Sequence, residues 1–390
     1  MQVDQFLKEL NVEFYTGVPD SQLRPICDYL MSAYGTDPAH HIVAANEGNA
    51  VAVASGYHMA TGRIPAVYMQ NSGEGNVVNP VASLTNKEVY AIPMLFLIGW
   101  RGEPGTHDEP QHIYQGKITL QLLEDMDITY AVVGEDTSVQ EVRKTMARFR
   151  YIFGAGKSAA FVIRKGAFEN AGLRRYSNRY RMVREDAIKC ILECAGSDPI
   201  VSTTGKISRE LYEARMQSGE SHRQDLLTVG SMGHCSSIAL GIALQKPGAR
   251  IWCIDGDGAV LMHMGAMAVI GLCAPPNLVH VVLNNEAHET VGGIPTAASR
   301  TDFPAVARAC GYEIALSVDN RDDLKKELVK AKERKALQFI EIKCALESRS
   351  NLGRPAAIPE ESKKDFVRYL GNFMPVIDIA DEERMKQNSQ

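Results

Sequence analysis

The chain has 390 residues, more than one ordinary hydrophobic core uses, so we expect two domains. Hydrophobic residues make up 45% and charged residues 23% of the sequence, which is typical of folded globular proteins and unlike disordered or fibrous chains. The net charge of -5 lacks the basic surplus that a nucleic-acid-binding surface requires, and this favours a small-molecule function.

The N-terminal segment, MQVDQFLKELNVEF, carries charges among its apolar residues and lacks the apolar core of a signal peptide. The longest apolar run, AIPMLFLIGW at 91–100, is far shorter than the ~20 residues that span a bilayer, and it predicts a buried strand. The eight cysteines include no CxxC pair, so we expect neither a disulfide framework nor a zinc site. These features predict a cytoplasmic protein with no membrane segment.

Short apolar runs alternate with helix-length amphipathic segments, which is typical of parallel sheets covered by helices. In order, the runs are VEFYTG, HIVAAN, IPAVYM, AIPMLFLIG, AAFVIR, PIVSTT, ARIWCIDG, LVHVVLNN and FIEIKC. Between AAFVIR and PIVSTT, residues 165–184 are polar and basic, which predicts an inter-domain linker with solvated charges. We expect an α/β fold with two doubly wound parallel-sheet domains, at 1–175 and 176–370, no middle domain, and a C-terminal tail at 371–390.

Two polar motifs follow consecutive predicted strands of the second half. Gly256-Asp257-Gly258 follows ARIWCI and Asn284-Asn285 follows LVHVVL, with 25 residues between them. Glycines let backbone amides approach a diphosphate, while Asp257 and Asn285 offer the hard oxygen ligands that Mg²⁺ prefers. A dinucleotide-binding GxGxxG is not present, because its last position is Leu261. The GAGKS at 154–158 is not a P-loop either, because Tyr151 stands where that loop needs a glycine.

The pair of motifs, with this spacing and placement, resembles the GDG and NN signature of thiamine-diphosphate enzymes. The resemblance implies two domains of the thiamine-diphosphate-enzyme type, with thiamine diphosphate and Mg²⁺ as cofactors. It also implies that Asp257, Asn285 and the backbone carbonyl of Ala287 hold the metal. The residues expected to bind the cofactor are Glu47, Thr204, Gly205, Lys206, Gly230, Met232, Gly256, Asp257, Gly258, Ala259 and Asn285.

Two further segments match the same family in the family's order. Glu47 follows HIVAA and begins a predicted helix, and it resembles the glutamate that meets the pyrimidine ring of the cofactor. The alternative for Glu47 is a helix-start glutamate favoured only by the helix dipole. Met232, in the GSMG at 230–233, resembles the bulky apolar residue wedged between the two rings of the bent cofactor. The alternative for Met232 is simple core filling.

Only a short linker joins the two halves, and in this the chain resembles the phosphonopyruvate and sulfopyruvate decarboxylases within the family. The segments that carry this match are GVPDSQL, NSGEGN, RGEPGTHDEPQH, STTGKISREL, NNEAHETVGGIPT and SRSNLGRP. The resemblance implies decarboxylation of 3-phosphonopyruvate to phosphonoacetaldehyde and CO₂ through the cofactor's ylide, in phosphonate biosynthesis. Sulfopyruvate is the alternative substrate; some sulfopyruvate enzymes resemble the two halves as separate subunits, so the fused chain favours phosphonopyruvate. A non-catalytic α/β phosphate-binding protein is the remote alternative.

Four more residues are candidates for the catalytic site. His107 and His112 lie in a loop after a buried strand and suit proton transfer, although exposed loop histidines are the alternative. Asp20 and Ser21 lie in a turn that resembles an active-site turn of the family, and Ser21 has the alternative role of a helix N-cap. Family resemblance also implies a homo-oligomer, dimeric or higher, with active sites between chains, acting on a small 2-oxo acid.

The substrate's anionic group requires positive potential in the site. The candidate donors are the helix-start amides at Ser21, together with Arg101, His107, His112 and Lys206. An ionised Asp20 would repel the same anion, so we expect Asp20 to be protonated or paired.

Overall fold

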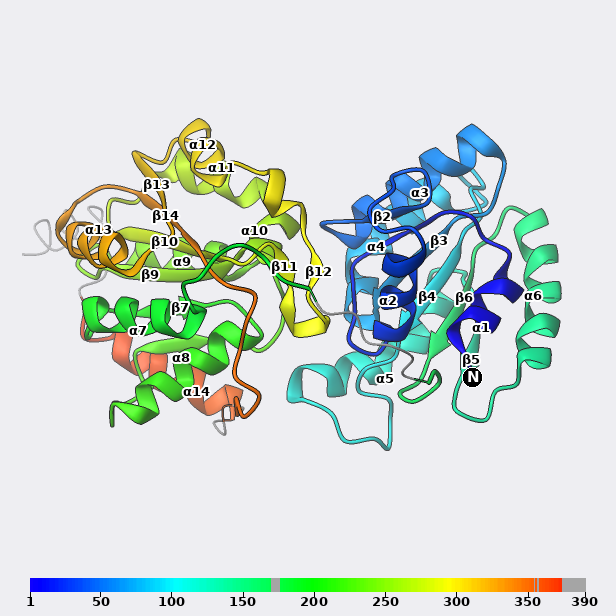
Figure 1. The fold of residues 1–390 in the computed structure, drawn as a ribbon, viewed down its shortest axis with the longest axis horizontal. Coiled ribbons are helices and arrows are strands. Elements are labelled where there is room, and N and C mark those ends of the chain that lie inside the picture. The colour runs from blue at the N-terminus through cyan, green and yellow to red at the C-terminus, as the bar shows by residue number, and fades with distance from the viewer. Residues whose placement is uncertain (170–175, 354, 356–357, 374–390) are drawn as a thin grey trace, which may run out of the picture. The chain divides into compact units, whose positions relative to one another are not determined.

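A computed structural model describes residues 1–169, 176–353, 355 and 358–373, and it forms two compact units. The first unit comprises Met1–Tyr176 together with the segment His288–Thr296, and the second comprises Ser177–Ala287 and the residues from Ala297 onward. Each unit is a six-stranded sheet covered by helices (Figure 1). The part of the expected C-terminal tail beyond residue 373 lies outside the described residues.

The sheet of the first unit has the strand order β2-β1-β3-β4-β6-β5, and its neighbouring strands are parallel. The strands are β1 (Tyr15–Gly17), β2 (His41–Val43), β3 (Ala66–Gln70), β4 (Leu95–Gly99), β5 (Thr129–Val133) and β6 (Ala159–Ile163). One apolar core takes side chains from α1 (Val3–Leu10), α2 (Arg24–Ala33) and α6 (Val139–Gly154). The core on the opposite face takes them from α3 (Glu47–Thr61), α4 (Glu74–Pro80) and α5 (Pro110–Asp125).

The sheet of the second unit has the order β13-β14-β10-β9-β7-β8 and is also parallel. Its strands are β7 (Ile200–Ser202), β8 (Asp225–Leu227), β9 (Ile251–Gly256), β10 (Leu278–Asn284), β13 (Ile314–Val318) and β14 (Gln338–Lys343). On one face lie α7 (Arg184–Ala195), α8 (Lys206–Gln217) and α13 (Arg321–Glu333). The other core includes α9 (Cys235–Gln245), α10 (Asp257–Met262), α11 (Gly265–Cys273), α12 (Phe303–Ala309) and α14 (Pro359–Leu370). A small ladder pairs β11 (Ala287–His288) with β12 (Ile294–Pro295).

The two units share one topology. When the six sheet strands of each unit are numbered in chain order, both sheets follow the order 2-1-3-4-6-5. The chain direction across the sheet therefore reverses between the first and third strands, and ligands of open α/β sheets bind at the carboxyl ends of strands at such a point. The expected α/β class with two doubly wound domains is confirmed. The switch points lie between β1 and β3 in the first unit and between β7 and β9 in the second.

The segment predicted to be a solvated linker is partly structural, and this corrects the sequence analysis. Arg184 is 3% exposed and begins α7, and its guanidinium donates to both carboxylate oxygens of Glu210 at 2.8 and 2.7 Å. A charge is buried here because it is paired and fully hydrogen-bonded, a relation that the basic composition of the segment does not reveal.

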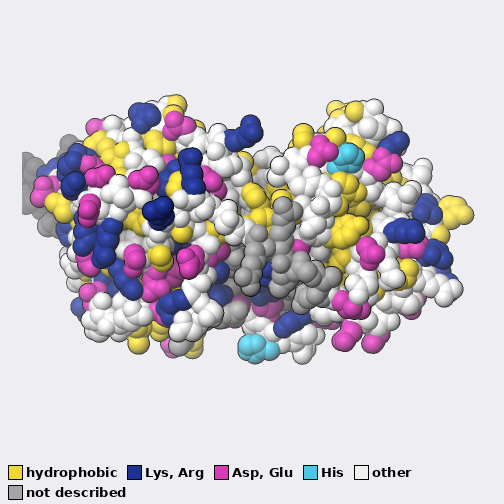
Figure 2. Space-filling model, in the orientation of Figure 1, with side chains coloured by type: hydrophobic (Ala, Val, Ile, Leu, Met, Phe, Trp, Pro, Cys, Tyr) yellow, Lys and Arg dark blue, Asp and Glu magenta, His cyan; other side chains and the backbone are white. Residues whose placement is uncertain are grey.

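Charges of both signs mingle on the surface. Figure 2 shows Lys and Arg side chains interspersed with Asp and Glu over the face in view, without a large basic field. Among the described residues, none of the helices has the length and apolarity needed to cross a membrane.

Candidate active site

Glu47 is the first residue of α3, immediately after the cap residue Asn46. The Asn46 side chain accepts hydrogen bonds from Gly48 N at 2.8 Å and Asn49 N at 3.4 Å, which starts the helix here. Glu47 is only 5% exposed, and Asn76 Nδ2 donates to Glu47 Oε2 at 2.7 Å. Burial raises the pKa of the Glu47 carboxyl, although the bond from Asn76 opposes the rise. A glutamate that served only the helix dipole would be solvated, so this environment supports the functional assignment.

The backbone around Glu47 is close enough to require glycine. A Cβ atom on Gly73 would lie 2.6 Å from Glu47 Oε1, and one on Gly48 would lie 2.9 Å from the carbonyl oxygen of Asn76. The NSGEGN segment thus supplies both a backbone surface against which the carboxyl lies and the amide that orients it.

The same segment contains a second buried acid, Glu74, that sequence reasoning did not single out. Glu74 is fully buried, and neither of its carboxylate oxygens has a hydrogen-bond partner among the described residues. Burial raises the pKa of Glu74 to about 9, so the side chain is neutral at physiological pH.

The protonation of Glu74 predicts a pH-dependent stability. The folded-state pKa of about 9 exceeds the ordinary value of 4.5, so between these pH values the unfolded chain releases a proton that the native state keeps. The free energy of unfolding should therefore fall as pH rises through this range, by up to ~1.4 kcal/mol per pH unit. Glu74→Gln should reduce the slope between pH 6 and 8 in urea unfolding, whereas the exposed Glu88→Gln should leave it unchanged. Equal slopes for wild type and Glu74→Gln would contradict the assignment.

Asp20 organises the turn after β1. Its Oδ2 accepts from Gln22 N at 3.0 Å and Leu23 N at 3.3 Å, and its Oδ1 accepts from Gln70 Nε2 at 2.6 Å. Burial raises the pKa of Asp20, while these bonds and the charge of Arg101 oppose the rise. The alternative role of Ser21 as the N-cap is wrong, because the Asp20 carboxylate accepts from the amides of this turn. For the same reason, the amides of Gln22 and Leu23 are engaged rather than open to a substrate anion.

Arg101, after β4, is the cation that the structure brings to this turn. Its Nε donates to Asp108 Oδ2 at 2.8 Å, and its Nη1 donates to Ser21 Oγ at 3.0 Å. Its backbone is fixed by Asn71, whose Nδ2 donates to the Arg101 carbonyl at 2.8 Å. Hydrogen bonds between side chains thus link the carboxyl ends of β1, β3 and β4. The candidates Asp20 and Ser21 both take part, because Asp20 accepts from Gln70 and Ser21 accepts from Arg101.

The two candidate histidines differ in environment. His107 is exposed in the loop before α5, whereas His112 is partly buried within the helix. Burial and the neighbouring Arg101 together lower the pKa of His112 to about 4, although Asp108 opposes the change. His112 is therefore neutral near pH 7 in this structure, and it can donate a neutral N–H hydrogen bond.

In the second unit, Thr204, Gly205 and Lys206 lie at the switch point. They follow β7 and open α8, and Gly205 has φ 95°, a backbone conformation that side chains disfavour. Thr204 Oγ1 donates to the Val229 carbonyl at 2.8 Å, and Lys206 Nζ donates to Ser348 Oγ at 2.7 Å. A helix N-terminus with a lysine at its first turn is suited to a diphosphate.

Met232 lies between two residues with left-handed backbone. Ser231 has φ 55° and Gly233 has φ 87°. A Cβ atom on Gly233 would lie 2.9 Å from the Ala259 carbonyl oxygen, so this segment packs directly on α10. Met232 remains partly exposed and is not among the buried core residues. This placement supports the wedge role over core filling.

The predicted metal ligands follow two paired strands. Leu283 of β10 lies beside Gly256 of β9. Asp257, which begins α10, and Asn284, which ends β10, are the next residues along the chain. Asp257 is 3% exposed and Asn285 is 4% exposed. A buried carboxylate, an amide oxygen and a backbone carbonyl at one sheet edge are the donor set that Mg²⁺ prefers.

Two family models match the chain, one in each half. Residues 2–124 match the thiamine pyrophosphate enzyme N-terminal TPP binding domain, and residues 204–342 match the C-terminal TPP binding domain. A phosphonopyruvate decarboxylase of Streptomyces viridochromogenes is 34% identical over 93% of this chain and 93% of its own length. The chain belongs to the thiamine pyrophosphate enzyme family.

Two further relatives define its place in the family. A phosphonopyruvate decarboxylase of Streptomyces hygroscopicus is 31% identical, covering 98% of this chain and 96% of the relative. A sulfopyruvate decarboxylase of Methanosarcina acetivorans is 26% identical, covering 95% of this chain and 97% of the relative. This thiamine pyrophosphate enzyme is a 2-oxo-acid decarboxylase, and the non-catalytic alternative is set aside. The Methanosarcina protein also shows that a chain spanning both halves is not particular to phosphonopyruvate enzymes, so the fused chain does not distinguish the two substrates.

Each unit of this thiamine pyrophosphate enzyme thus fits one part of the cofactor. The acid held by Asn76 suits the pyrimidine, while α8 and the Asp257 and Asn285 edge suit a diphosphate with Mg²⁺. The sequence analysis missed Asn76, Gln70 and Asp108, although all three lie in or beside segments that carried the family match.

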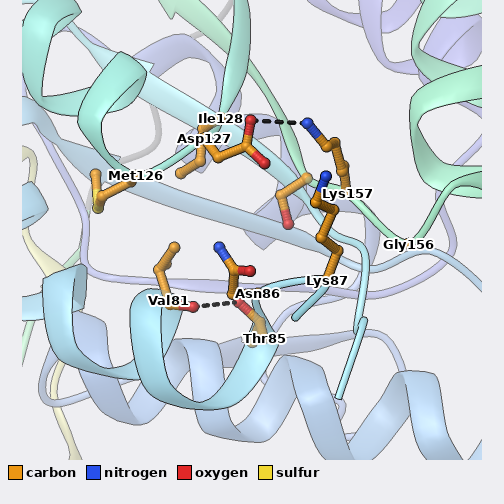
Figure 3. Close-up of a pocket in the computed structure, with 10 residues that line it drawn as sticks. Val81, Thr85, Asn86, Lys87, Met126, Asp127, Ile128, Gly156 and Lys157 are labelled. Atoms are coloured by element: carbon orange, nitrogen blue, oxygen red, sulfur yellow. Dashed lines mark hydrogen bonds and ion pairs between the residues drawn. The ribbon is translucent and has the colours of Figure 1, made fainter. Parts of the chain in front are cut away.

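The small pocket drawn in Figure 3 lies elsewhere on the first unit. Its lining precedes β5 and β6 at the amino edge of the sheet and includes Gly156 and Lys157 of the rejected P-loop motif. Lys157 Nζ binds Asp127 at 2.8 Å, so its charge is already paired. The candidate site residues lie at the carboxyl edge, and this pocket is not part of the site.

Proposed function

We propose that this enzyme decarboxylates 3-phosphonopyruvate to phosphonoacetaldehyde and CO₂, with a proton replacing the lost carboxylate, in phosphonate biosynthesis. The observation that carries the proposal is the 34% identity to a phosphonopyruvate decarboxylase over nearly the whole length of both chains. The sulfopyruvate relative is 26% identical over a similar length, and sulfopyruvate is therefore the second candidate substrate.

The residues of this chain would hold and orient the reacting groups. When bound, thiamine diphosphate supplies a thiazolium carbon that adds to the ketone and a cationic ring that accepts the electron pair left by CO₂. Glu47, whose carboxyl pKa is raised by burial and whose side chain is oriented by Asn76, would share a proton with the pyrimidine. Asp257, Asn285 and the Ala287 carbonyl would hold Mg²⁺ against the diphosphate, with Lys206 and the start of α8 as further anion donors.

Arg101 is the proposed contact for the phosphonate. Its guanidinium keeps N–H groups beyond those bonded to Asp108 and Ser21, because it has five donors. An arriving anion would also raise the pKa of His112 from about 4, so a larger share of that imidazole would carry a proton to donate in the complex. His107 remains a candidate for the same step.

Substrate preference tests this proposal. Turnover of phosphonopyruvate, sulfopyruvate and pyruvate should be compared at pH 6 and pH 8. A phosphonate has a second pKa near 6, by analogy with phosphate, so it carries more charge than a sulfonate at pH 8. We expect phosphonopyruvate to be preferred over pyruvate by at least ~100-fold in kcat/KM, a loss of at least ~2.7 kcal/mol for the missing anionic group. The ratio of kcat/KM for phosphonopyruvate to that for sulfopyruvate should be smaller at pH 6 than at pH 8. Equal or better turnover of sulfopyruvate at pH 8 would assign the protein to the second candidate.

We also propose that the enzyme is a homo-oligomer in which the first unit of one chain completes the site with the second unit of another. Glu47 and Asp257 belong to different units, and several helices are apolar on their outer faces. On α11, Val269 is 53% and Leu272 is 85% exposed, and on α3, Met59 is 68% exposed. A helix that is apolar on all sides is typically covered on all sides.

The apolar face of α11 predicts how assembly can be broken. Leu272→Glu should weaken the dimer and lower specific activity in parallel, as measured by sedimentation velocity across a concentration series. Tyr151→Glu is the control, because Tyr151 is 84% exposed on the charged helix α6 and should leave assembly unchanged. A fully active monomeric wild type would contradict the proposal.

We also propose a cytoplasmic location. The eight cysteines are all free in the structure, as in proteins of a reducing compartment.

A further inference from the structure

The segment that begins the second unit contacts the turn that carries the proposed metal ligands. Asn178 Nδ2 donates to the Asn285 carbonyl at 2.9 Å, and Tyr180 Oη donates to Glu286 Oε1 at 2.7 Å. Neither residue belongs to a helix or strand, and neither was a candidate from the sequence. Both residues therefore contact the Asn285–Ala287 turn, although they lie outside the sequence motifs that carried the family match.

Asn178 uses the full capacity of its amide. A second Nδ2 bond reaches the Cys344 carbonyl at 2.9 Å, and Oδ1 accepts from Tyr180 N at 3.2 Å and Leu346 N at 3.4 Å. One side chain thus ties together three segments of chain: the C-terminal part of the predicted linker, the turn after β10, and the residues after β14. An amide that makes four bonds holds its partners in a narrow range of geometry.

The turn requires such support because its backbone is strained. Glu286 has φ 61°, a left-handed conformation that costs a non-glycine residue about 1–3 kcal/mol. Glu286 N donates to Asn284 Oδ1 at 2.9 Å, while Asn284 Nδ2 donates to Glu341 Oε1 at 2.7 Å. Tyr180 completes this set by binding the Glu286 side chain, and Lys343 Nζ lies 5.6 Å from the centre of the Tyr180 ring. The strained residue lies between the two proposed ligands Asn285 and Ala287, so its conformation sets the direction of both.

We propose that Asn178 and Tyr180 are positioning residues that hold the Asn285–Ala287 turn in its metal-binding conformation. This inference rests on the proposed Mg²⁺ site. Outer contacts that orient metal ligands typically change metal affinity by 10- to 100-fold. This part of the predicted linker would then have a second role besides joining the two units, which is to set the Mg²⁺ requirement for cofactor binding.

The test measures thiamine diphosphate binding to the apoprotein by isothermal titration calorimetry, without substrate, over a series of Mg²⁺ concentrations. Tyr180→Phe and Asn178→Ala should raise the Mg²⁺ concentration for half-saturation by ~10-fold or more. Saturating Mg²⁺ should restore kcat to near the wild-type value, which a general folding defect would not allow. In the apoprotein without metal, Tyr180→Phe should lower the thermal midpoint only slightly. The loss of metal affinity should therefore be larger than the loss of stability explains.

Tyr369→Phe is the matched control. The Tyr369 hydroxyl, like that of Tyr180, donates a hydrogen bond within the second unit. Its acceptor is the carbonyl of Ser197, which precedes β7 at the opposite edge of the sheet. The Mg²⁺ concentration for half-saturation of Tyr369→Phe should equal that of wild type. Half-saturation of Tyr180→Phe and Asn178→Ala within twofold of wild type, or an equal shift in Tyr369→Phe, would overturn the positioning role. If cofactor binding by the wild-type protein did not depend on Mg²⁺, that result would instead overturn the proposed metal site.

Discussion

Glu47→Gln should reduce kcat by about 10³-fold while the protein still folds and binds thiamine diphosphate, since general acid-base groups contribute about 10²- to 10⁴-fold. The substitution keeps the size of the side chain and a hydrogen-bonding carbonyl, but it removes the proton that Glu47 can share. Burial raises the pKa of this carboxyl, which is the property that proton sharing near neutral pH requires. Steady-state turnover and calorimetric cofactor binding should be measured on the same preparation.

The control for Glu47 is the neighbouring acid. Glu74→Gln changes a buried carboxyl in the same way, but at a residue with no proposed contact to the cofactor. It should keep turnover within a few-fold of wild type. Near-normal activity of Glu47→Gln would remove Glu47 from the mechanism, and equal losses in both variants would indicate a structural effect.

Asp257→Ala should weaken thiamine diphosphate binding by at least ~100-fold at 1 mM Mg²⁺, because it removes a hard oxygen ligand together with its charge. The buried carboxylate at the start of α10 has no equivalent replacement among the other two proposed ligands, which are uncharged. Equilibrium dialysis with Mg²⁺ and with excess chelator would report the effect. Chelator should weaken wild type strongly and the variant little, whereas unchanged affinity in Asp257→Ala would exclude the proposed ligand.

The architecture of the sheets was largely accessible from the sequence. Central strands such as β4 and β10 are buried along their whole length and appear as continuous apolar runs. The strands that the runs did not include, β5, β8 and β13, are the edge strands of their sheets. Residues of β5 and β13 are mostly half-buried, unlike those of the central strands.

Buried polar groups set the limit of sequence reasoning in the site. The family signature pointed to Glu47, Asp257 and Asn285, since those residues stand at fixed positions after strands. It did not reveal that Asp20 rather than Ser21 binds the turn amides, or that Glu74 is buried without a partner among the described residues. The Asp20 bonds are local to the turn, whereas the burial of Glu74 depends on packing between segments distant in sequence. The His288–Thr296 segment is a similar case, because Ile294 packs in the core of the first unit although its neighbours in sequence belong to the second.

Reconstitution of the apoprotein tests the central claim most directly. Phosphonopyruvate should be incubated with apoprotein alone, with thiamine diphosphate, with Mg²⁺, and with both, and the products followed by phosphorus NMR together with CO₂ release. The account predicts stoichiometric phosphonoacetaldehyde and CO₂ only when both cofactors are present, and almost none with Glu47→Gln. Absence of product with both cofactors, or an equal rate without thiamine diphosphate, would contradict it.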